Sequence, residues 1–236
     1  MIGHSVVRRC TIKDAGVCGI AGLFAAHMLI EDNLIEGSGW QKMELSWEAG
    51  AIKLHNSVDG LIRHNVFRNT FRAEGMNRGG TSVDAKLINN IFYHCEEAAI
   101  KMPTKANEAE GNCYVKEEGG YLRILYLQPP VCLHLPAWQE FYGFDLHGQE
   151  AWFDVDVDTE KLTFTCKKAA KKPFAFPGEL EKRKFVFEPE KTRSVDSSAL
   201  ILADFYGIEI ENGRCLPGPF AELDPNRIYD IDLRKK

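Results

Sequence analysis

Three basic residues, Lys53, Arg78 and Lys101, recur at nearly equal intervals in the first half of the chain. A lysine whose pKa is depressed by burial or by a neighbouring cation can act as a base, while a second cation neutralises a carboxylate. These groups suit removal of a proton next to a carboxylate, the first step of β-elimination on a uronate sugar, and we take them as candidate catalytic residues. The simpler interpretation is a solvated row of charges, because exposed lysines are common.

A second group of side chains suits binding of a substrate. The stretch 37–49, GSGWQKMELSWEA, carries Trp40 and Trp47, and His55 and Asn77 follow it. Indole rings combine an apolar face with a polar edge, so they can stack on sugar rings. We take these four residues as candidate substrate-binding residues. The alternative is that both indoles pack this segment onto the body of the protein.

One sequence motif is repeated along the first half of the chain. It reads MLIEDNLIEGSG from Met28, GLIRHNVFRNTF from Gly60 and AKLINNIFYHCE from Ala85. Aligning the copies of this motif places Cys10 and four asparagines in one column, and the spacing of these residues is that of a solenoid repeat. Identical amides stacked one above another can form a hydrogen-bonded ladder. We therefore predict a structural ladder of Asn33, Asn65, Asn90 and Asn112.

A second column follows the asparagines and holds Ile20, Ile52, Met76 and Ile100. The pattern predicts two short strands in each coil, and a coil of this kind buries its apolar face by stacking in parallel on its neighbours. Strand side chains alternate between the two faces. The row next to this column should therefore face outward as a polar strip of Lys53, Asn77 and Lys101, with His55 beside it.

These coils resemble the right-handed parallel β-helix repeats of the pectin-lyase-like superfamily over residues 5–118. The resemblance implies an all-β solenoid that binds or cleaves polysaccharides. A narrower resemblance lies in AGAIKLHNSVDGLIRHNVFRN, which is similar to a stretch of the parallel β-helix β-xylosidases. In that family an Asp and a Glu on two later strands perform the chemistry. The corresponding positions here are Gly79 and Lys101, so the catalytic carboxylates are absent from them.

The second half of the chain departs from the repeat. We divide the sequence into β-helix coils at 1–118 and, at 119–236, the final coil or coils with a β-rich segment that caps or wraps the solenoid. FDVDVDTEKLTFT alternates cleanly and predicts an antiparallel hairpin, and Asn212-Gly213 predicts another turn of this type. The aromatic stretch LPAWQEFYGFDLHG predicts a loop or short helix and resembles the C-terminal parts of bacterial β-helix proteins.

Composition excludes several classes of protein. The 236 residues carry a net charge of −5 with no basic face, so we expect no nucleic-acid partner. The chain has no apolar run long enough to span a membrane and no signal-peptide layout, which predicts no membrane partner and a cytoplasmic location. Seven cysteines without a CxxC pair favour reduced thiols over a zinc site, and we expect neither a metal nor a cofactor. The DxDxD of the hairpin lacks the glycine and glutamate of a calcium loop.

The function predicted from these patterns is carbohydrate binding or processing by a glycoside-hydrolase-like β-helix protein. Two alternatives stay open: a non-catalytic interaction or structural module, which includes part of a longer protein, and a polysaccharide lyase that acts on uronates. The repeat begins almost at the first residue, whereas solenoids usually cover their terminal coil. We therefore also expect a homo-oligomer or a missing N-terminal segment.

Overall fold

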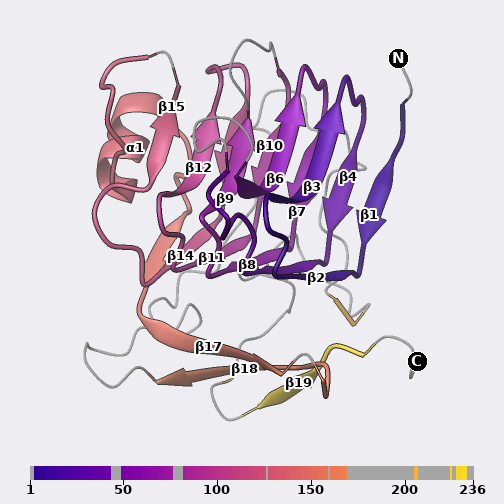
Figure 1. The fold of residues 1–236 in the computed structure, drawn as a ribbon. Helices are drawn as coiled ribbons and strands as arrows, with labels where there is room; N and C mark the ends of the chain where they lie inside the picture. Colours follow the sequence, from indigo (N-terminus) through magenta and orange to yellow (C-terminus); the bar gives the residue numbers. More distant parts are fainter. Residues whose placement is uncertain are drawn as a thin grey trace.

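The computed structural model describes residues 3–43, 49–76, 82–125, 127–158, 160–168, 205–206, 224 and 227–232. Over this part of the chain the fold is almost entirely β-structure, wound into coils whose strands stack in parallel (Figure 1). The predicted fold class, a parallel β-helix with an antiparallel C-terminal appendage, is confirmed.

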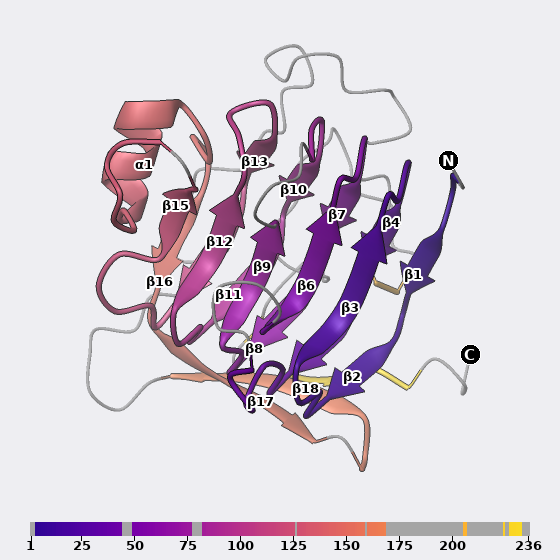
Figure 2. The ribbon, with the colours of Figure 1, turned by 45° about the horizontal axis from the view of Figure 1, so that its top comes forward.

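Each coil contributes one strand to each of three parallel sheets. Sheet 1 consists of β1 (Val6–Arg8), β4 (Leu29–Glu31), β7 (Leu61–Arg63), β10 (Lys86–Ile88) and β13 (Glu108–Glu110). Sheet 2 consists of β2 (Thr11–Lys13), β5 (Leu34–Glu36), β8 (Val66–Arg68), β11 (Ile91–Tyr93), β14 (Cys113–Val115) and β16 (Gln149–Ala151). Sheet 3 consists of β3 (Cys18–Leu23), β6 (Gly50–His55), β9 (Arg72–Met76), β12 (Ala98–Met102) and β15 (Leu122–Ile124), which lie side by side in Figure 2.

A coil therefore has three strands, and the prediction of two is wrong. The repeated motif covers two of these three strands, because the chain bends sharply between the two apolar pairs of the motif. At this first corner, residues in the left-handed region precede the asparagine column: Arg9, Asp32, His64 and Asn89 have φ of 56°, 54°, 55° and 58°. Short polar side chains tolerate this conformation better than β-branched ones, so the corner carries a polar residue in most coils.

The asparagine column forms a continuous ladder inside the first corner. The side-chain Oδ1 of Asn33, Asn65, Asn90 and Asn112 each accepts the backbone N–H of the equivalent residue one coil earlier, at 2.9–3.0 Å. Each of these amides also donates to a carbonyl of the preceding coil. The ladder ends on Asp145, whose Oδ1 accepts the N–H of Asn112 at 3.1 Å.

The coils enclose a narrow apolar core. An aromatic stack runs through it: Phe67, Phe92, Tyr114 and Tyr121 follow one another with ring centroids 5.0, 5.3 and 5.0 Å apart. These rings are at most 2% exposed. Stacked coils thus place like side chains on like side chains, which is how a solenoid buries a surface that one coil cannot bury alone.

The last coil is covered by the segment that follows it. Helix α1 (Leu135–Tyr142) buries Trp138 against the end of the core, and the aromatic stretch predicted as a loop or short helix is thus a helix. Beyond β16 the chain forms the predicted hairpin of β17 (Phe153–Asp158) and β18 (Thr163–Lys168), joined by β19 (Ile228–Asp230) into an antiparallel sheet. The turn predicted at Asn212-Gly213 lies outside the described residues.

Candidate functional site

Lys53 and Lys101 lie in one row of sheet 3, on either side of Gly75. Adjacent strands are about 4.8 Å apart, so the two backbones are separated by about 10 Å. Lys53 is only 4% exposed and Lys101 8%. Ile52 and Ile100 on the same strands belong to the apolar core, so alternation directs both lysines outward as predicted. Both are nevertheless buried, and the alternative interpretation as a solvated row is wrong for them.

Gly75 stands between the two lysines in this row, at the place where the alignment put Asn77. The alignment placed Met76 beside Ile52, but Glu74 pairs with Ile52 and Met76 pairs with Leu54. A shift of two residues leaves every side chain of a strand on the same face, so an alternating pattern cannot reveal it. Asn77 itself, together with Arg78, Gly79 and Trp47, lies outside the described residues, and His55 ends β6 with a partly exposed side chain.

Trp40 lies at a hollow of about 430 Å³ at the second corner, between sheets 2 and 3. The hollow is lined by Asp14, Gly37, Ser38, Trp40, Asn69, Phe71 and Glu96, which come from four successive coils. Trp40 is 59% exposed, although its indole N–H donates to the carbonyl of Asp14 at 3.0 Å. The ring is thus held by its polar edge while much of its apolar surface stays accessible.

The segment that carries Trp40 is fastened to its neighbours by backbone hydrogen bonds. Gly37 N–H donates to Arg68 O, Gly39 N–H to Ala15 O, and the Ser38 carbonyl accepts from the N–H of Phe71. Gly37 has φ of +63°, and a Cβ at this position would lie 2.5 Å from Asp14 Oδ1. The positive φ and the lack of space for a Cβ atom both require glycine at position 37. The sequence GSGW therefore builds a fixed turn that presents the tryptophan.

Polar atoms of several kinds surround the aromatic ring. Asp14 and Asn69 are exposed at the left-handed positions of this corner. The Ser38 Oγ is buried and has no hydrogen-bond partner within the described part of the chain. Glu96 is paired with Lys42, whose ammonium lies 5.5 Å from the centroid of the Phe71 ring. The hollow thus combines aromatic surface with hydrogen-bond acceptors and one ion pair.

A cluster of charged residues adjoins this hollow, since Arg72 and Glu97 directly follow two of its lining residues, Phe71 and Glu96. Arg72 and Lys101 are buried and Glu97 is partly exposed. Glu97 accepts hydrogen bonds from both Arg72 and Lys101, and its side chain is 36% exposed. Burial lowers the pKa of Lys101, and the nearby Arg72 lowers it further, while the Glu97 pairing opposes both. Arg123 is next to Lys101 in the same row.

Sequence reasoning identified Trp40 but missed most of its surroundings. Asp14, Asn69 and Glu96 lie outside the aligned apolar columns, and no motif singles them out. One signal was present: Asp14, Gly37 and Asn69 occupy the same corner position in successive coils and all have positive φ. The recurrence of Asp, Gly and Asn there is typical of such corners and does not by itself indicate a binding site.

Comparison with known families agrees with this architecture. The sequence model of right-handed beta helix regions matches residues 2–127. The chain belongs to this right-handed beta helix family. The match covers most of the coils of this β-helix protein, including every residue that lines the hollow. Neither curated proteins nor solved structures give a match.

Within the described ranges, no helix has the length and apolar character needed to cross a bilayer. This agrees with the absence of a long apolar run in the sequence.

Proposed function

We propose that this β-helix protein binds a glycan in the hollow around Trp40. The observation that carries the proposal is the exposed indole, fixed through its N–H to Asp14 at the edge of a hollow of about 430 Å³. Small-ligand sites commonly have volumes of about 300–1,000 Å³ and combine aromatic walls with a few polar groups. A sugar ring fits this chemistry, since its C–H face can lie on the indole while its hydroxyls face outward.

The polar lining supports the same ligand class. Sugar hydroxyls can donate to the Asp14 and Glu96 carboxylates, and the Asn69 amide can both donate and accept. The Ser38 Oγ supplies a further group whose hydrogen bond is unmade in the described part of the chain. A ligand that satisfies this hydroxyl removes the cost of a buried unpaired polar atom.

The extent of the hollow favours an oligosaccharide over a single sugar. Asp14 belongs to the first coil and Glu96 to the fourth, so the lining spans three strand spacings, about 14 Å along the axis. Trp40 is the exposed aromatic residue of the lining, whereas Phe71 is partly buried. We therefore place one sugar ring on Trp40 and its neighbours along the second corner.

Replacement of Trp40 by alanine should weaken binding of the preferred oligosaccharide at least tenfold. Truncation of an aromatic residue that anchors a ligand costs about 2 kcal/mol or more, and 1.4 kcal/mol corresponds to tenfold in affinity. Calorimetric titration with a panel of neutral and acidic oligosaccharides measures the change. Phe141→Ala is a matched control, because Phe141 is also an exposed aromatic residue, at 61%, but lies on α1. Equal losses in both variants, or no binding by the wild type, would refute the proposal.

A second candidate function is elimination on a uronate-containing glycan, and the burial of Lys101 beside Arg72 favours it. In this reaction the Lys101 amine takes the proton next to the substrate carboxylate and a carbon–carbon double bond forms. The bond to the leaving sugar oxygen breaks at the same time, and that oxygen takes a proton from solvent water to leave as a hydroxyl. The substrate carboxylate would replace Glu97 as the partner of Arg72. Glu97 is the most accessible member of the cluster, so it marks the point of entry.

Elimination predicts that Lys101→Gln abolishes formation of unsaturated uronate products. Lys161→Gln serves as the matched control, since the Lys161 side chain is 80% exposed and lies in the hairpin turn. Binding of the same substrate should survive in Lys101→Gln if the lysine acts as the base. Absence of unsaturated products with the wild-type protein on all uronate substrates would exclude this second function and leave the binding proposal standing.

A further inference from the structure

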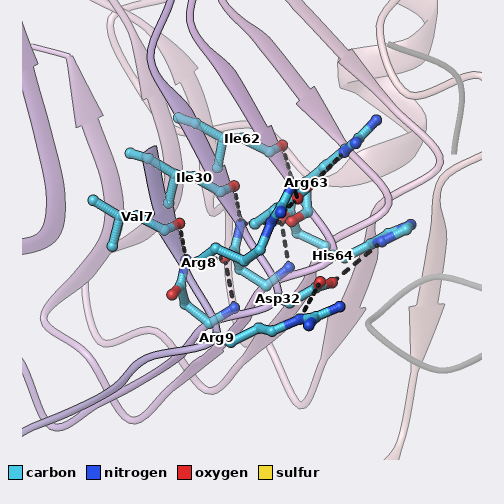
Figure 3. A network of polar contacts seen from close by, with 12 residues as sticks. Val7, Arg8, Arg9, Ile30, Asp32, Ile62, Arg63 and His64 are labelled. Carbon is cyan, nitrogen blue, oxygen red and sulfur yellow. Dashed lines mark hydrogen bonds and ion pairs between the residues drawn. The ribbon is translucent and has the colours of Figure 1, made fainter. Parts of the chain in front are cut away.

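Acidic residues at the first corner have basic partners in the coils on both sides. Asp32 Oδ2 lies 3.7 Å from Arg9 Nε, and its Oδ1 lies 3.5 Å from His64 Nδ1. Figure 3 shows Asp32 between these two side chains. Glu31, the preceding residue, is likewise paired with arginines of both neighbouring coils. At this corner both acidic side chains of the second coil are therefore matched by the protein itself.

Asp14, at the second corner, departs from this arrangement. Its side chain is exposed and forms no ion pair or hydrogen bond within the described ranges. Lys13, the preceding cation, is in register with Glu36 of the next coil. The negative charge of Asp14 thus lacks a cationic partner in this part of the chain.

The charge of the hollow around Trp40 follows from this difference. The charged residues among its described lining are both acidic, Asp14 and Glu96. Glu96 is paired with Lys42, so its charge is compensated. Asp14 adds one negative charge without a partner. Like charges brought together in a site are unfavourable, so a sugar carboxylate suits this hollow poorly and a positively charged group suits it well.

The carboxylate of Asp14 lies against the turn that presents Trp40. A Cβ atom on Gly37, the first residue of this turn, would lie 2.5 Å from Asp14 Oδ1. The backbone carbonyl of the same aspartate accepts the indole N–H of Trp40 at 3.0 Å. Asp14 thus holds the ring through its backbone, and its side chain stays available to a ligand on the ring.

The aromatic rings at this hollow differ in their cationic neighbours. Lys42 Nζ lies 5.5 Å and Arg72 Cζ 5.2 Å from the centroid of the Phe71 ring. Trp40 has no such cation within the described part of the chain, and it is 59% exposed. Indole binds cations more strongly than a phenyl ring does. A ligand that brings a positive charge therefore finds an accessible indole beside a carboxylate without a partner.

We infer that the hollow prefers amino sugars, which are glycans with a free amino group, and this depends on the glycan binding proposed above. The ammonium group lies between the Trp40 ring and the Asp14 carboxylate. Hydroxyls of the same sugar bond to Asn69 and to Ser38 Oγ, which has no partner within the described residues. An N-acetylated or uronate-containing glycan lacks the positive charge and binds more weakly.

A lysine-rich peptide is another ligand that brings an ammonium group to an aromatic ring. Its side chain carries no hydroxyl, so it leaves the buried Ser38 hydroxyl without a partner. A buried polar group without a partner costs free energy. An amino sugar carries ammonium and hydroxyl groups on one ring, and it therefore matches more of the lining.

Matched glycan pairs measure the preference. Glucosamine and galactosamine oligosaccharides are titrated calorimetrically into the whole protein, each in its free-amine form and in its N-acetylated form, because acetylation removes the charge and keeps the ring. In a pair that binds, the free-amine form should bind at least fivefold more tightly, and added salt should reduce this ratio.

The other outcomes of these titrations separate the preference from glycan binding itself. Equal affinities of the two forms, or tighter binding of a uronate oligosaccharide, would overturn the preference and leave glycan binding in place. Oligolysine that binds more tightly than the amino sugars and loses its affinity in Trp40→Ala would also contradict the inference. Binding of no oligosaccharide at all would refute the proposed function as well.

Asp14→Asn locates the preference. Asparagine removes the charge, tolerates the φ of 53° at this position, and keeps the backbone carbonyl that holds the Trp40 N–H. The variant should lose at least threefold in affinity for the free-amine form. Asp84→Asn is the matched control, since Asp84 is also exposed and has φ of 59°, but it lies between sheets 3 and 1. A preference for the free amine that persists in Asp14→Asn, or falls equally in Asp84→Asn, would contradict the inference.

Discussion

Replacement of Asn65 by alanine is expected to lower the free energy of unfolding by about 3–5 kcal/mol. The Asn65 Oδ1 accepts from the backbone N–H and the side-chain amide of Asn33, both at 3.0 Å. Its own amide donates to Ile30 O, Arg63 O and Asn90 Oδ1. Asn65 is fully buried, so water cannot replace these partners. Each buried polar group left unpaired costs about 1–3 kcal/mol.

Equilibrium urea denaturation measures this loss, and Asn69→Ala provides the control. Asn69 is an exposed asparagine of the same coil, at the second corner, with φ of 49°. Its replacement removes a residue that tolerates the left-handed region, at a cost of about 1 kcal/mol. A loss at position 65 no greater than that at position 69 would show that the ladder contributes little to stability.

Stability is expected to fall as the pH rises from about 4 to about 8. Burial raises the pKa of Asp145 from 3.8 to about 7, and burial also raises the pKa of Glu117 from 4.5 to about 8. Between the unfolded and folded pKa values, the unfolded chain has released these protons while the folded protein still holds them. Unfolding is then favoured by each further rise in pH. For Asp145, which is fully buried, the loss is on the order of 4 kcal/mol.

Asp145→Asn tests the cause of this dependence. Asparagine keeps an oxygen that can accept from Asn112 and leaves a polar group beside the Tyr114 hydroxyl, but it does not ionise. The variant should unfold with similar free energy near pH 5 and be more stable than the wild type near pH 8. Urea denaturation at the two pH values provides the comparison. A wild-type protein that is more stable at pH 8 than at pH 5, with the same difference in Asp145→Asn, would contradict the assignment.

The asparagine ladder could be predicted from sequence because its chemistry repeats. Every coil needs the same acceptor at the first corner, so the same residue type returns at Asn33, Asn65, Asn90 and Asn112. Asp145 was missed as the last member, because it comes from the segment after α1 and breaks the period. The hairpin was predictable for a similar local reason: Phe153, Val155 and Val157 alternate with aspartates and are buried.

The candidate site was less accessible to such reasoning. Alternation of side chains assigns a residue to one face of a strand, but it does not reveal what covers that face, so the burial of Lys53 and Lys101 was not predicted. The alternating pattern also looks the same when a strand is shifted by two residues. For this reason Met76 was aligned with Ile52, although Glu74 is the residue that pairs with it. Trp40 was found by residue type alone. Its neighbours Asp14 and Glu96 are brought to it by the stacking of coils.

The indole N–H resonance of Trp40, followed by two-dimensional NMR during titration with an oligosaccharide of the panel, tests the central claim most directly. The N–H is fixed on Asp14 O and belongs to a ring that is 59% exposed, whereas Trp138 is fully buried on the inner face of α1 and serves as the internal reference. Glycan binding in the hollow predicts a saturable shift of the Trp40 resonance with the Trp138 resonance unchanged. A bound oligosaccharide that leaves the Trp40 resonance unshifted would contradict the account.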